Sequence, residues 1–479
     1  MARPDDYPAD HLAARALPQL KSERSGGPLA AVRNANQKAL PDQPIGRRSL
    51  LKGAGAGALA LGAGGLLAAC GSNGIKGAGG SSATGTINIG FITPLTGALA
   101  GFASGDRFVL SQIKATSAYK DGIKIGGKKY KVAITVKDSQ SSPTRAGQVA
   151  QELALQNKVD LILTTSTPEV TNPVAAQCEK QGTPCLSTVV PWESWYAGLG
   201  GNPLKPTETF KYCTMFFFGL KEFLGTFSPM WKRISTDKVV GCQYPNDADG
   251  NAFRGGFEPL IKSVGYKVVD GGAYADGTTD FTSMITLFKN KKAEIFSNCP
   301  LPPDFNTFWK QASQQGWKPR LATVAKVLLF PADTKALGPL VNNIATDSWW
   351  GPYMPYNSSL SGVSAASLAS AYQSATGNEW VQSIGSSYAL FEVAKEAFSA
   401  VSDPHDKTEV ADALHKVSYT GMCGAINFAG GPAPGVGIIP PVGVQWKKST
   451  GKYPFEMMVV DNSLNPNVKV QAKLEPTNA

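Results

Sequence analysis

The chain has 479 residues, with 46 lysines and arginines against 36 aspartates and glutamates and a formal net charge of +10. Residues 1–69 hold nine of the basic and five of the acidic side chains, which leaves +6 on the remainder. This charge is small for the chain's size and no basic run stands out, which excludes the charge pattern of nucleic-acid-binding proteins. The length exceeds what one hydrophobic core usually holds, so we expect two lobes.

Residues 1–45 lack apolar periodicity and are rich in proline, aspartate, arginine, alanine and glutamine. This composition is typical of disordered segments, so we predict a disordered leader that adds nothing to the fold. Alternatively, the start codon is assigned too early and translation begins nearer Val32.

Residues 46–69 resemble a bacterial twin-arginine export signal that ends in a lipobox. Two adjacent arginines precede a run of glycine, alanine and leucine, which ends in Leu67-Ala68-Ala69-Cys70. Glycine recurs through this run and is a poor helix former, so a buried or membrane-spanning helix is the weaker interpretation. The pattern predicts export, cleavage before Cys70, a lipid on the Cys70 thiol, and a flexible tether over residues 70–85.

Assigning Cys70 to lipid leaves six cysteines, an even number that favours disulfides in an exported chain. Cys178 lies in a predicted helix and Cys185 opens the next predicted strand, a separation that suits a disulfide between them. Cys213 and Cys423 both fall at predicted crossings between lobes, which suggests a second pair. Metal binding is the rival interpretation, but the body has no Cys-x-x-Cys pair and only two histidines. We therefore expect no metal and no cofactor.

Short apolar strands alternate with amphipathic helices from Thr86 onward. The strands are predicted over 87–92, 131–136, 159–163 and 185–190, with a helix over 146–154 between two of them. Such alternation favours parallel sheets built from right-handed βαβ units. In these sheets ligands bind beyond the carboxyl ends of the strands.

Two loops at this predicted sheet edge have the composition of a binding site. Thr164 to Glu169 place hydroxyls, a proline and an acid at a helix start. Free backbone N–H groups there suit a carboxylate or another anion, although an ordinary capped helix fits the same pattern equally well. The next strand leads into Pro191-Trp192-Glu193-Ser194-Trp195-Tyr196, an aromatic cluster placed either to wall a pocket or to pack in the core.

A second series of strands and helices predicts a second α/β lobe. Its strands are predicted over 239–244, 267–269, 294–297 and 321–324, and its helices over 250–264, 281–289 and 305–315. Later helices are expected over 364–376, 386–401 and 407–416. Trp349 and Trp350 lie near a predicted lobe crossing, where packing of the hinge is favoured over lining a pocket.

The order of these elements resembles that of type I periplasmic solute-binding proteins of the leucine/isoleucine/valine class. The resemblance is carried by the strand and Pro-Leu-Thr-Gly turn at 87–97, by Asp138-Ser139, by the Ser166/Thr167 loop, by 238–247 and 281–285, and by closing strands near 421–428 and 444–446. It extends from Thr86 to Asp461 and depends on order and spacing rather than on one motif.

The resemblance implies an α/β fold of two Rossmann-like lobes with parallel sheets, joined by a three-strand hinge and closing on a small solute. On this expectation residues 86–212 and 350–421 form the first lobe, and residues 213–349 and 422–479 form the second. The implied ligand-binding residues are Phe102, Ser166, Thr167, Glu169, Val190, Trp192 and Glu193 from the first lobe and Asn246, Asp247, Asn298, Leu301 and Lys326 from the second.

One position departs from the family pattern and bears on the ligand. Amino-acid binders of this family place an acid after the fourth strand of the second lobe, whereas this chain has Ala325 followed by Lys326. Either another acid replaces it, or Lys326 favours an anionic solute such as a carboxylate, stacked on Trp192 and Trp195. A solvated lysine at the strand end is the alternative. The candidate replacement acids are Glu169, Glu193 and Asp247.

The sequence therefore predicts an exported, lipid-anchored protein that captures a small polar or amphiphilic organic solute (an amino acid, amide or carboxylate) for an ABC-type permease. We expect a monomer on the outer side of the cytoplasmic membrane or in the periplasm, with its lipid as the only membrane contact. A ligand-sensing surface lipoprotein is the first alternative. An exported hydrolase is a weaker one, because the chain has neither a Gly-x-Ser-x-Gly nor a His-Glu-x-x-His motif.

Overall fold

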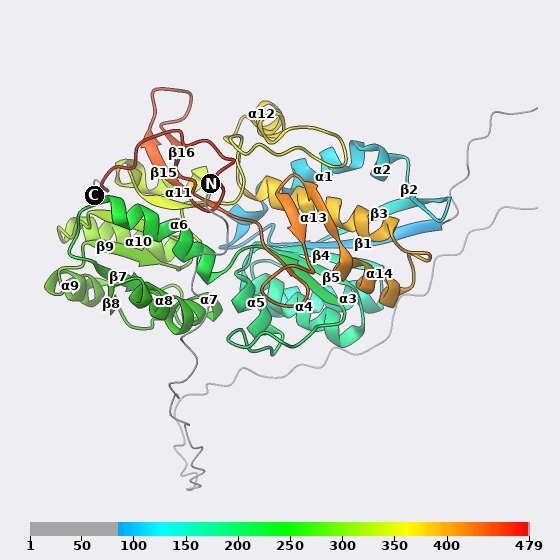
Figure 1. Cartoon of the computed structure of the whole chain (residues 1–479), viewed down its shortest axis with the longest axis horizontal. Helices are drawn as coiled ribbons and strands as arrows, with labels where there is room; N and C mark the ends of the chain where they lie inside the picture. Colours follow the sequence, from blue (N-terminus) through cyan, green and yellow to red (C-terminus); the bar gives the residue numbers. More distant parts are fainter. Residues whose placement is uncertain (1–84, 478–479) are drawn as a thin grey trace, which may run out of the picture. The chain divides into compact units, whose positions relative to one another are not determined.

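A computed structural model describes residues 85–477, which form two α/β lobes, each built on a sheet with flanking helices (Figure 1). The predicted class of two Rossmann-like lobes is confirmed. The expected leader, export signal and lipidated Cys70 lie outside the described residues, as does almost all of the tether. Within residues 85–477, no helix has both the length and the apolar composition needed to cross a membrane.

The first lobe is built on a seven-stranded sheet with the order β14-β6-β5-β4-β1-β3-β2. Neighbouring strands in it are parallel, except that β2 and β3 pair antiparallel. Every residue of β4, Leu-Ile-Leu-Thr-Thr, is buried, as expected for a central strand covered by helices on both faces. The strands are β1 (Gly85–Thr93), β2 (Ile123–Ile125), β3 (Lys128–Asp138), β4 (Leu161–Thr165), β5 (Cys185–Thr188), β6 (Cys213–Phe216) and β14 (Val436–Gly437).

Helices of the first lobe begin and end at recognisable signals. In α3 the Ser142 side chain caps the helix and Pro143 opens it, and buried alanine, valine and leucine side chains recur at helical spacing. A short hairpin of β12 (Ser418–Gly421) and β13 (Gly424–Asn427) follows the last helix. The helices are η1 (Ala100–Ala103), α1 (Asp106–Ala115), α2 (Ser117–Lys120), α3 (Pro143–Leu155), α4 (Pro168–Gln181), α5 (Trp192–Gly198), α12 (Ala365–Thr376), α13 (Ser383–Ser399) and α14 (Lys407–Lys416).

The second lobe is built on another seven-stranded sheet, with the order β16-β15-β11-β10-β9-β7-β8. Its first five strands in chain order pair parallel, and the late strand β15 pairs antiparallel with both β11 and β16. The strands are β7 (Val239–Gln243), β8 (Lys267–Asp270), β9 (Ile295–Asn298), β10 (Leu321–Val324), β11 (Ala345–Ser348), β15 (Val442–Lys448) and β16 (Phe455–Asp461).

The core of the second lobe is strongly aromatic. The ring of Phe296 on β9 stacks on that of Phe308 with centroids 5.0 Å apart, and Trp309 and Trp317 pack against the same ring. The surrounding helices are α6 (Leu220–Arg233), α7 (Ala248–Ala252), the π-helical turn η2 (Phe253–Phe257), α8 (Glu258–Ser263), α9 (Thr282–Asn290), α10 (Pro302–Gln314), α11 (Pro331–Leu337) and η3 (Gly338–Val341).

The chain passes between the two sheets after β6, after β11 and after β14. This corrects the predicted boundaries, which start the second lobe at Cys213 and again at residue 422. Strand β6 pairs with β5 and β14, so residues 213–216 belong to the first sheet, and the hairpin near residue 422 packs with α13 in the same lobe. A short apolar strand fits either sheet by its sequence, because strand pairing depends on distant residues.

The predicted disulfides are not present. All six cysteines among residues 85–477 are buried free thiols. The register of β5 and β6 sets Cys185 beside Cys213, and the Cys213 thiol donates a 3.2 Å hydrogen bond to the Ala175 carbonyl. Cys423 lies instead at the turn between β12 and β13, so the predicted pairing of Cys213 with Cys423 fails because these residues do not flank a common lobe crossing.

Two glycines inside helices test how tightly the hinge region is packed. The indole of Trp350, which follows β11, lies directly over Gly385 of α13, so a Cβ atom there would overlap the ring. We expect Gly385→Ala to lower the free energy of unfolding by about 1–3 kcal/mol, measured by urea unfolding. Gly147→Ala in α3 is the matched control, because the nearest atom to its Cβ would be 3.8 Å away.

Alanine at position 147 should be neutral or raise the free energy of unfolding by up to about 1 kcal/mol, since it reduces the freedom of the unfolded chain. Equal effects of the two substitutions would contradict the close packing of Trp350 on α13.

Candidate solute-binding site

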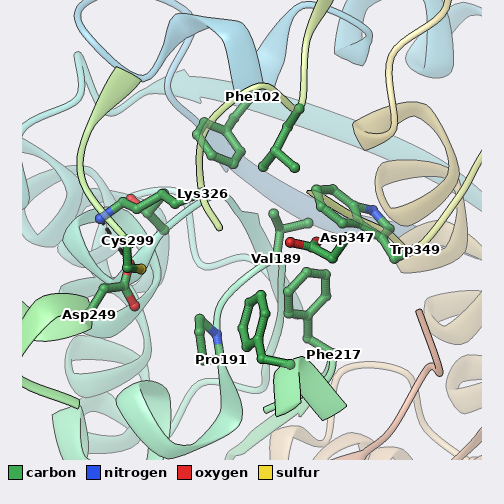
Figure 2. Close-up of a pocket in the computed structure, with 12 residues that line it drawn as sticks. Phe102, Val189, Pro191, Phe217, Asp249, Cys299, Lys326, Asp347 and Trp349 are labelled. Carbon is green, nitrogen blue, oxygen red and sulfur yellow. Dashed lines mark ion pairs between the residues drawn. The ribbon is translucent and has the colours of Figure 1, made fainter. Parts of the chain in front are cut away.

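Loops from both lobes line a narrow pocket of about 30 Å³ (Figure 2). Its walls are mainly apolar and aromatic, with a few ionisable side chains among them. This combination of an apolar chamber and a small number of polar groups is typical of small-molecule sites. The lining residues are Phe102, Thr167, Val189, Pro191, Phe217, Phe223, Asp249, Cys299, Lys326, Leu329, Asp347 and Trp349.

Most of the lining residues come from loops that follow strands. Thr167 follows β4, Val189 follows β5, Phe217 follows β6, Asp249 follows β7 and Lys326 follows β10. The carboxyl ends of parallel strands from two sheets therefore meet at one place. This is the edge at which open α/β sheets bind their ligands.

The side chain of Lys326 is surrounded by carboxylates at one end of the pocket, and the residue is only 7% exposed. Its Nζ lies 2.8 Å from Asp249 Oδ2, 3.2 Å from Asp247 Oδ2 and 3.2 Å from Glu169 Oε1. Burial lowers the pKa of Lys326, but the three negative charges outweigh burial and hold this pKa well above its usual range. Lys326 is therefore a cation whose charge is already balanced by the protein.

The acids around Lys326 have different surroundings. Burial raises the pKa of Asp249 to about 7, although Lys326 opposes this shift. Burial also raises the pKa of Glu169, but the charge of Lys326 and hydrogen bonds outweigh burial and hold it below its usual range. Asp247 caps α7, where its Oδ1 accepts a 2.6 Å hydrogen bond from the Gly250 N–H. Three carboxyl groups around one ammonium leave the cluster no surplus positive charge.

Unusual backbone angles mark three of the strand ends at the pocket. The φ angle is +110° at Ser166, +60° at Val189 and +66° at Lys326. Residues other than glycine rarely adopt positive φ, and a β-branched valine there is a genuine outlier. Such strain persists only where surrounding contacts hold it, and it is concentrated at binding sites.

Buried hydroxyl groups gather just before α4. Those of Thr164, Thr165 and Ser166 make no hydrogen bond within the part of the chain that the structure describes. Helix α4 begins directly afterwards at Pro168, with Thr167 as its N-cap. Of this segment only Thr167 lines the pocket, so its hydroxyl is the one that a solute in the pocket can reach.

The side of the pocket away from Lys326 is aromatic (Figure 2). Phe217 and Trp349 meet edge to face with ring centroids 5.1 Å apart, and Phe102 of the first lobe packs against Phe330 of the second at 4.8 Å. The carboxyl group of Asp347 lies among these rings. Burial raises the pKa of Asp347 to about 7, although hydrogen bonds from its own backbone and from Thr346 oppose the shift.

Five of the residues predicted from the sequence lie at this pocket. Phe102, Thr167 and Lys326 line it, and Glu169 and Asp247 reach it through their ion pairs with Lys326. The rule that strand ends converge accounts for this result, because all but Phe102 lie in the loop or the first helical turn after a parallel strand.

Other predicted residues lie elsewhere. Val190 is buried beside the pocket, while its neighbours Val189 and Pro191 line it. Trp192 and Glu193 begin α5 and line a separate, largely apolar groove between α5 and α7. These two residues therefore line the groove rather than the pocket that contains Lys326.

The remaining predicted residues hold the loops of the second lobe. Asn246 is exposed and accepts a hydrogen bond from Asn251, and Leu301 precedes α10 as its N-cap. The Asn298 side chain is buried and accepts a hydrogen bond from the Ala325 N–H, which fixes the backbone just before Lys326.

The sequence prediction omits several lining residues. Asp249 lies two residues beyond the predicted Asp247, and Phe217 follows β6, which was assigned to the wrong lobe. Trp349 was assigned to packing, and Asp347 is a polar residue inside a strand with no local signal of a site. Pro191 and Cys299 lie inside the implied contact segments 190–193 and 298–301, and the lining residues outside the implied set are Val189, Phe217, Phe223, Asp249, Leu329, Asp347 and Trp349.

This chain is similar to a known protein family and to solved structures over most of its length. A family model described as periplasmic binding protein matches residues 86–437. The fold is similar to that of a leucine binding protein from Thermotoga maritima, with 18% identity, a TM-score of 0.62, and coverage of 78% of this chain and 98% of that one.

Two further structures carry bound solutes. A branched-chain amino acid transporter substrate binding protein from Streptococcus pneumoniae, in complex with isoleucine, is 19% identical with a TM-score of 0.59, covering 82% of this chain and 99% of that one. An ABC transporter solute binding protein from R. palustris, in complex with benzoate, is 15% identical with a TM-score of 0.60, covering 78% and 96%. At these identities the likeness concerns the fold alone.

Removing the charge of Lys326 tests the ion-pair cluster. In Lys326→Met the three acids lose their common partner, and we expect the free energy of unfolding to fall by about 3–5 kcal/mol. Urea unfolding at pH 7 measures the loss. Lys447→Met is the matched control, because Lys447 pairs with a half-exposed Glu475 and should lose less than about 1 kcal/mol. A loss no larger than the control's would show that the cluster does not hold the lobes.

The raised pKa of Asp347 predicts a pH dependence of stability. In the unfolded chain this acid has a pKa of about 3.9, so the folded state holds the proton more tightly. The stabilisation is complete below about pH 4 and is lost as the pH rises through about 7. Asp347→Asn removes this contribution, so we expect its unfolding free energy to fall over this pH range by up to about 4 kcal/mol less than that of the wild-type protein. Urea unfolding at several pH values measures the difference. Parallel pH profiles of the two proteins would contradict the assignment.

Proposed function

The chain belongs to the periplasmic binding protein family, and on that premise we propose that it captures a small organic solute outside the cytoplasm for an ABC-type permease. The resemblance found in the sequence is thereby confirmed, and the chain is a ligand-binding protein rather than an enzyme. One observation carries the proposal: the strand ends of both lobes converge on a pocket with apolar walls and a few polar groups.

Contacts between the lobes support a closing motion around the solute. Lys326 of the second lobe pairs with Glu169 of the first, and Ser194 of the first lobe donates to Asp249 of the second at 3.2 Å. The three crossings give the lobes a hinge. A solute that contacts both lobes binds the closed form more tightly and so shifts the population towards it.

The pocket favours a solute with an apolar body, and its charge disfavours a simple carboxylate. Lys326 is already paired with three carboxyl groups, so it offers no free charge to an anion. The aromatic rings predicted to stack on such an anion are also elsewhere: Trp192 lines the separate groove, and Trp195 is buried with its N–H donating to Ser187. Among the predicted solute classes, these contacts support amino acids and amides over carboxylates.

Export and anchoring complete the proposal. The sequence pattern over residues 46–69 supports secretion, and the cysteine at its end supports a lipid anchor at Cys70. A protein tethered in this way stays beside the membrane where a permease receives its cargo. We propose that it works there as a monomer.

A thermal-shift screen of the purified protein tests the proposed function. The panel contains branched-chain and aromatic amino acids, their amides, deaminated carboxylates, and organic amines. A true solute at 100 times its Kd stabilises the folded state by about 2.7 kcal/mol, which raises the Tm by several degrees.

Phe217→Ala, which opens the pocket wall, should lose this shift. Phe210→Ala is the matched control, because Phe210 packs on Trp195 and Tyr196 away from the pocket and should keep the shift. Failure of every compound in the panel to raise the Tm of the wild-type protein would overturn the proposal.

A further inference from the structure

Asp347 lies where the second lobe leads into a crossing towards the first. It is the third residue of β11, which pairs with β10 on one side and with β15 on the other. The chain then continues through Trp349 into the first lobe. The carboxyl group of Asp347 lies in the pocket between Val189 and Phe217, and it is a separate group from the acids around Lys326 (Figure 2).

One oxygen of the Asp347 carboxyl group faces the pocket without a hydrogen-bond partner from the described residues. The residue is 2% exposed, its Oδ1 has no hydrogen-bond partner among residues 85–477, and none of the ion pairs in that range includes it. By contrast, buried Asp106 accepts hydrogen bonds from Thr93 at 2.5 Å and Ser387 at 2.7 Å, and Asp249 pairs with Lys326. Burying an ionised carboxylate with an unpartnered oxygen is costly, so the group either keeps a proton or takes a cation from outside the protein as its counterpart.

The surroundings of Asp347 restrict the chemistry of that counterpart. The rings of Phe217 and Trp349 form its near wall, with Val189 on the other side (Figure 2). Aromatic faces attract cations, and a carboxylate adds the opposite charge at close range. An anionic solute would meet repulsion from Asp347, and a neutral apolar one would leave the carboxyl group unsatisfied.

We propose that Asp347 binds the positively charged nitrogen of the solute, so that the protein takes ammonium compounds with an apolar body. This inference rests on the proposed solute-binding function and names the charge of the solute. It also assigns different roles to the acids at the two ends of one pocket. The acids near Lys326 neutralise a lysine of the protein, and Asp347 remains for a cation that arrives with the solute.

Two matched solute sets test the inference by calorimetric titration of the full chain. The first is phenethylamine, 2-phenylethanol and phenylacetate, and the second is L-leucine and 4-methylpentanoate. We expect an amine-bearing member of at least one set to bind about 10- to 100-fold more tightly than its counterparts without nitrogen. In Asp347→Asn, which keeps the shape and removes the charge, this preference should disappear.

Asp333→Asn is the matched control. Asp333 is half-buried and also has a buried, unpartnered Oδ2, but it lies in α11 and does not line the pocket, so the preference for the amine should survive there. If Asp347→Asn does not fold, the comparison of the matched solutes on the wild-type protein still decides the charge of the solute.

Three results would overturn the inference: tighter binding of an acid or alcohol than of its amine, an unchanged preference in Asp347→Asn, or no binding of any amine-bearing member. The proposed function would survive each of these results if another class in the thermal-shift panel bound. It would fail only if the whole panel left the Tm unchanged.

Discussion

The ammonium group of Lys326 holds carboxylates that separate lobes bring to it, Glu169 from the first and Asp247 and Asp249 from the second. Because the ammonium is buried, removing any partner from it leaves charge in a poorly solvated place. Contact between the lobes and neutralisation of the charges in this cluster therefore depend on each other. A further consequence is that the most conspicuous charge in the pocket is unavailable to the solute, whose own charge must be recognised at another residue.

Much of the fold follows from local patterns. Helix α14 spans the predicted residues 407–416, and β10 spans the predicted 321–324, because helical periodicity and continuous apolar runs are local properties. The lobe boundaries do not follow in this way. Residues 213–216 join the first sheet through β5, 28 positions earlier in the register, and through a two-residue strand near residue 436. Such partners are chosen by the assembled sheet rather than by the strand itself.

The binding-site residues also divide into those that local sequence predicts and those that depend on distant parts of the chain. Thr167 and Lys326 could be predicted, because the ends of parallel strands form the ligand edge of a sheet and each strand was recognisable. Trp192 begins α5 and lines another groove, a placement that depends on where the helix starts and not on the aromatic composition of the loop. Asp347 was missed because its neighbours along the strand carry no signal. Its burial depends on β15, which pairs Gly443 with Asp347 from a distant part of the chain.

Asp249 and Asp347 show how one pocket separates internal neutralisation from recognition. Burial raises the pKa of each acid to about 7, yet Asp249 touches Lys326 whereas Asp347 faces aromatic rings. A cation bound at Asp347 contacts the residues where the chain crosses between lobes, since Phe217 and Trp349 belong to two of the crossings. Binding there therefore acts directly on the hinge. It stabilises the closed form and does not compete for the charged groups that already join the lobes.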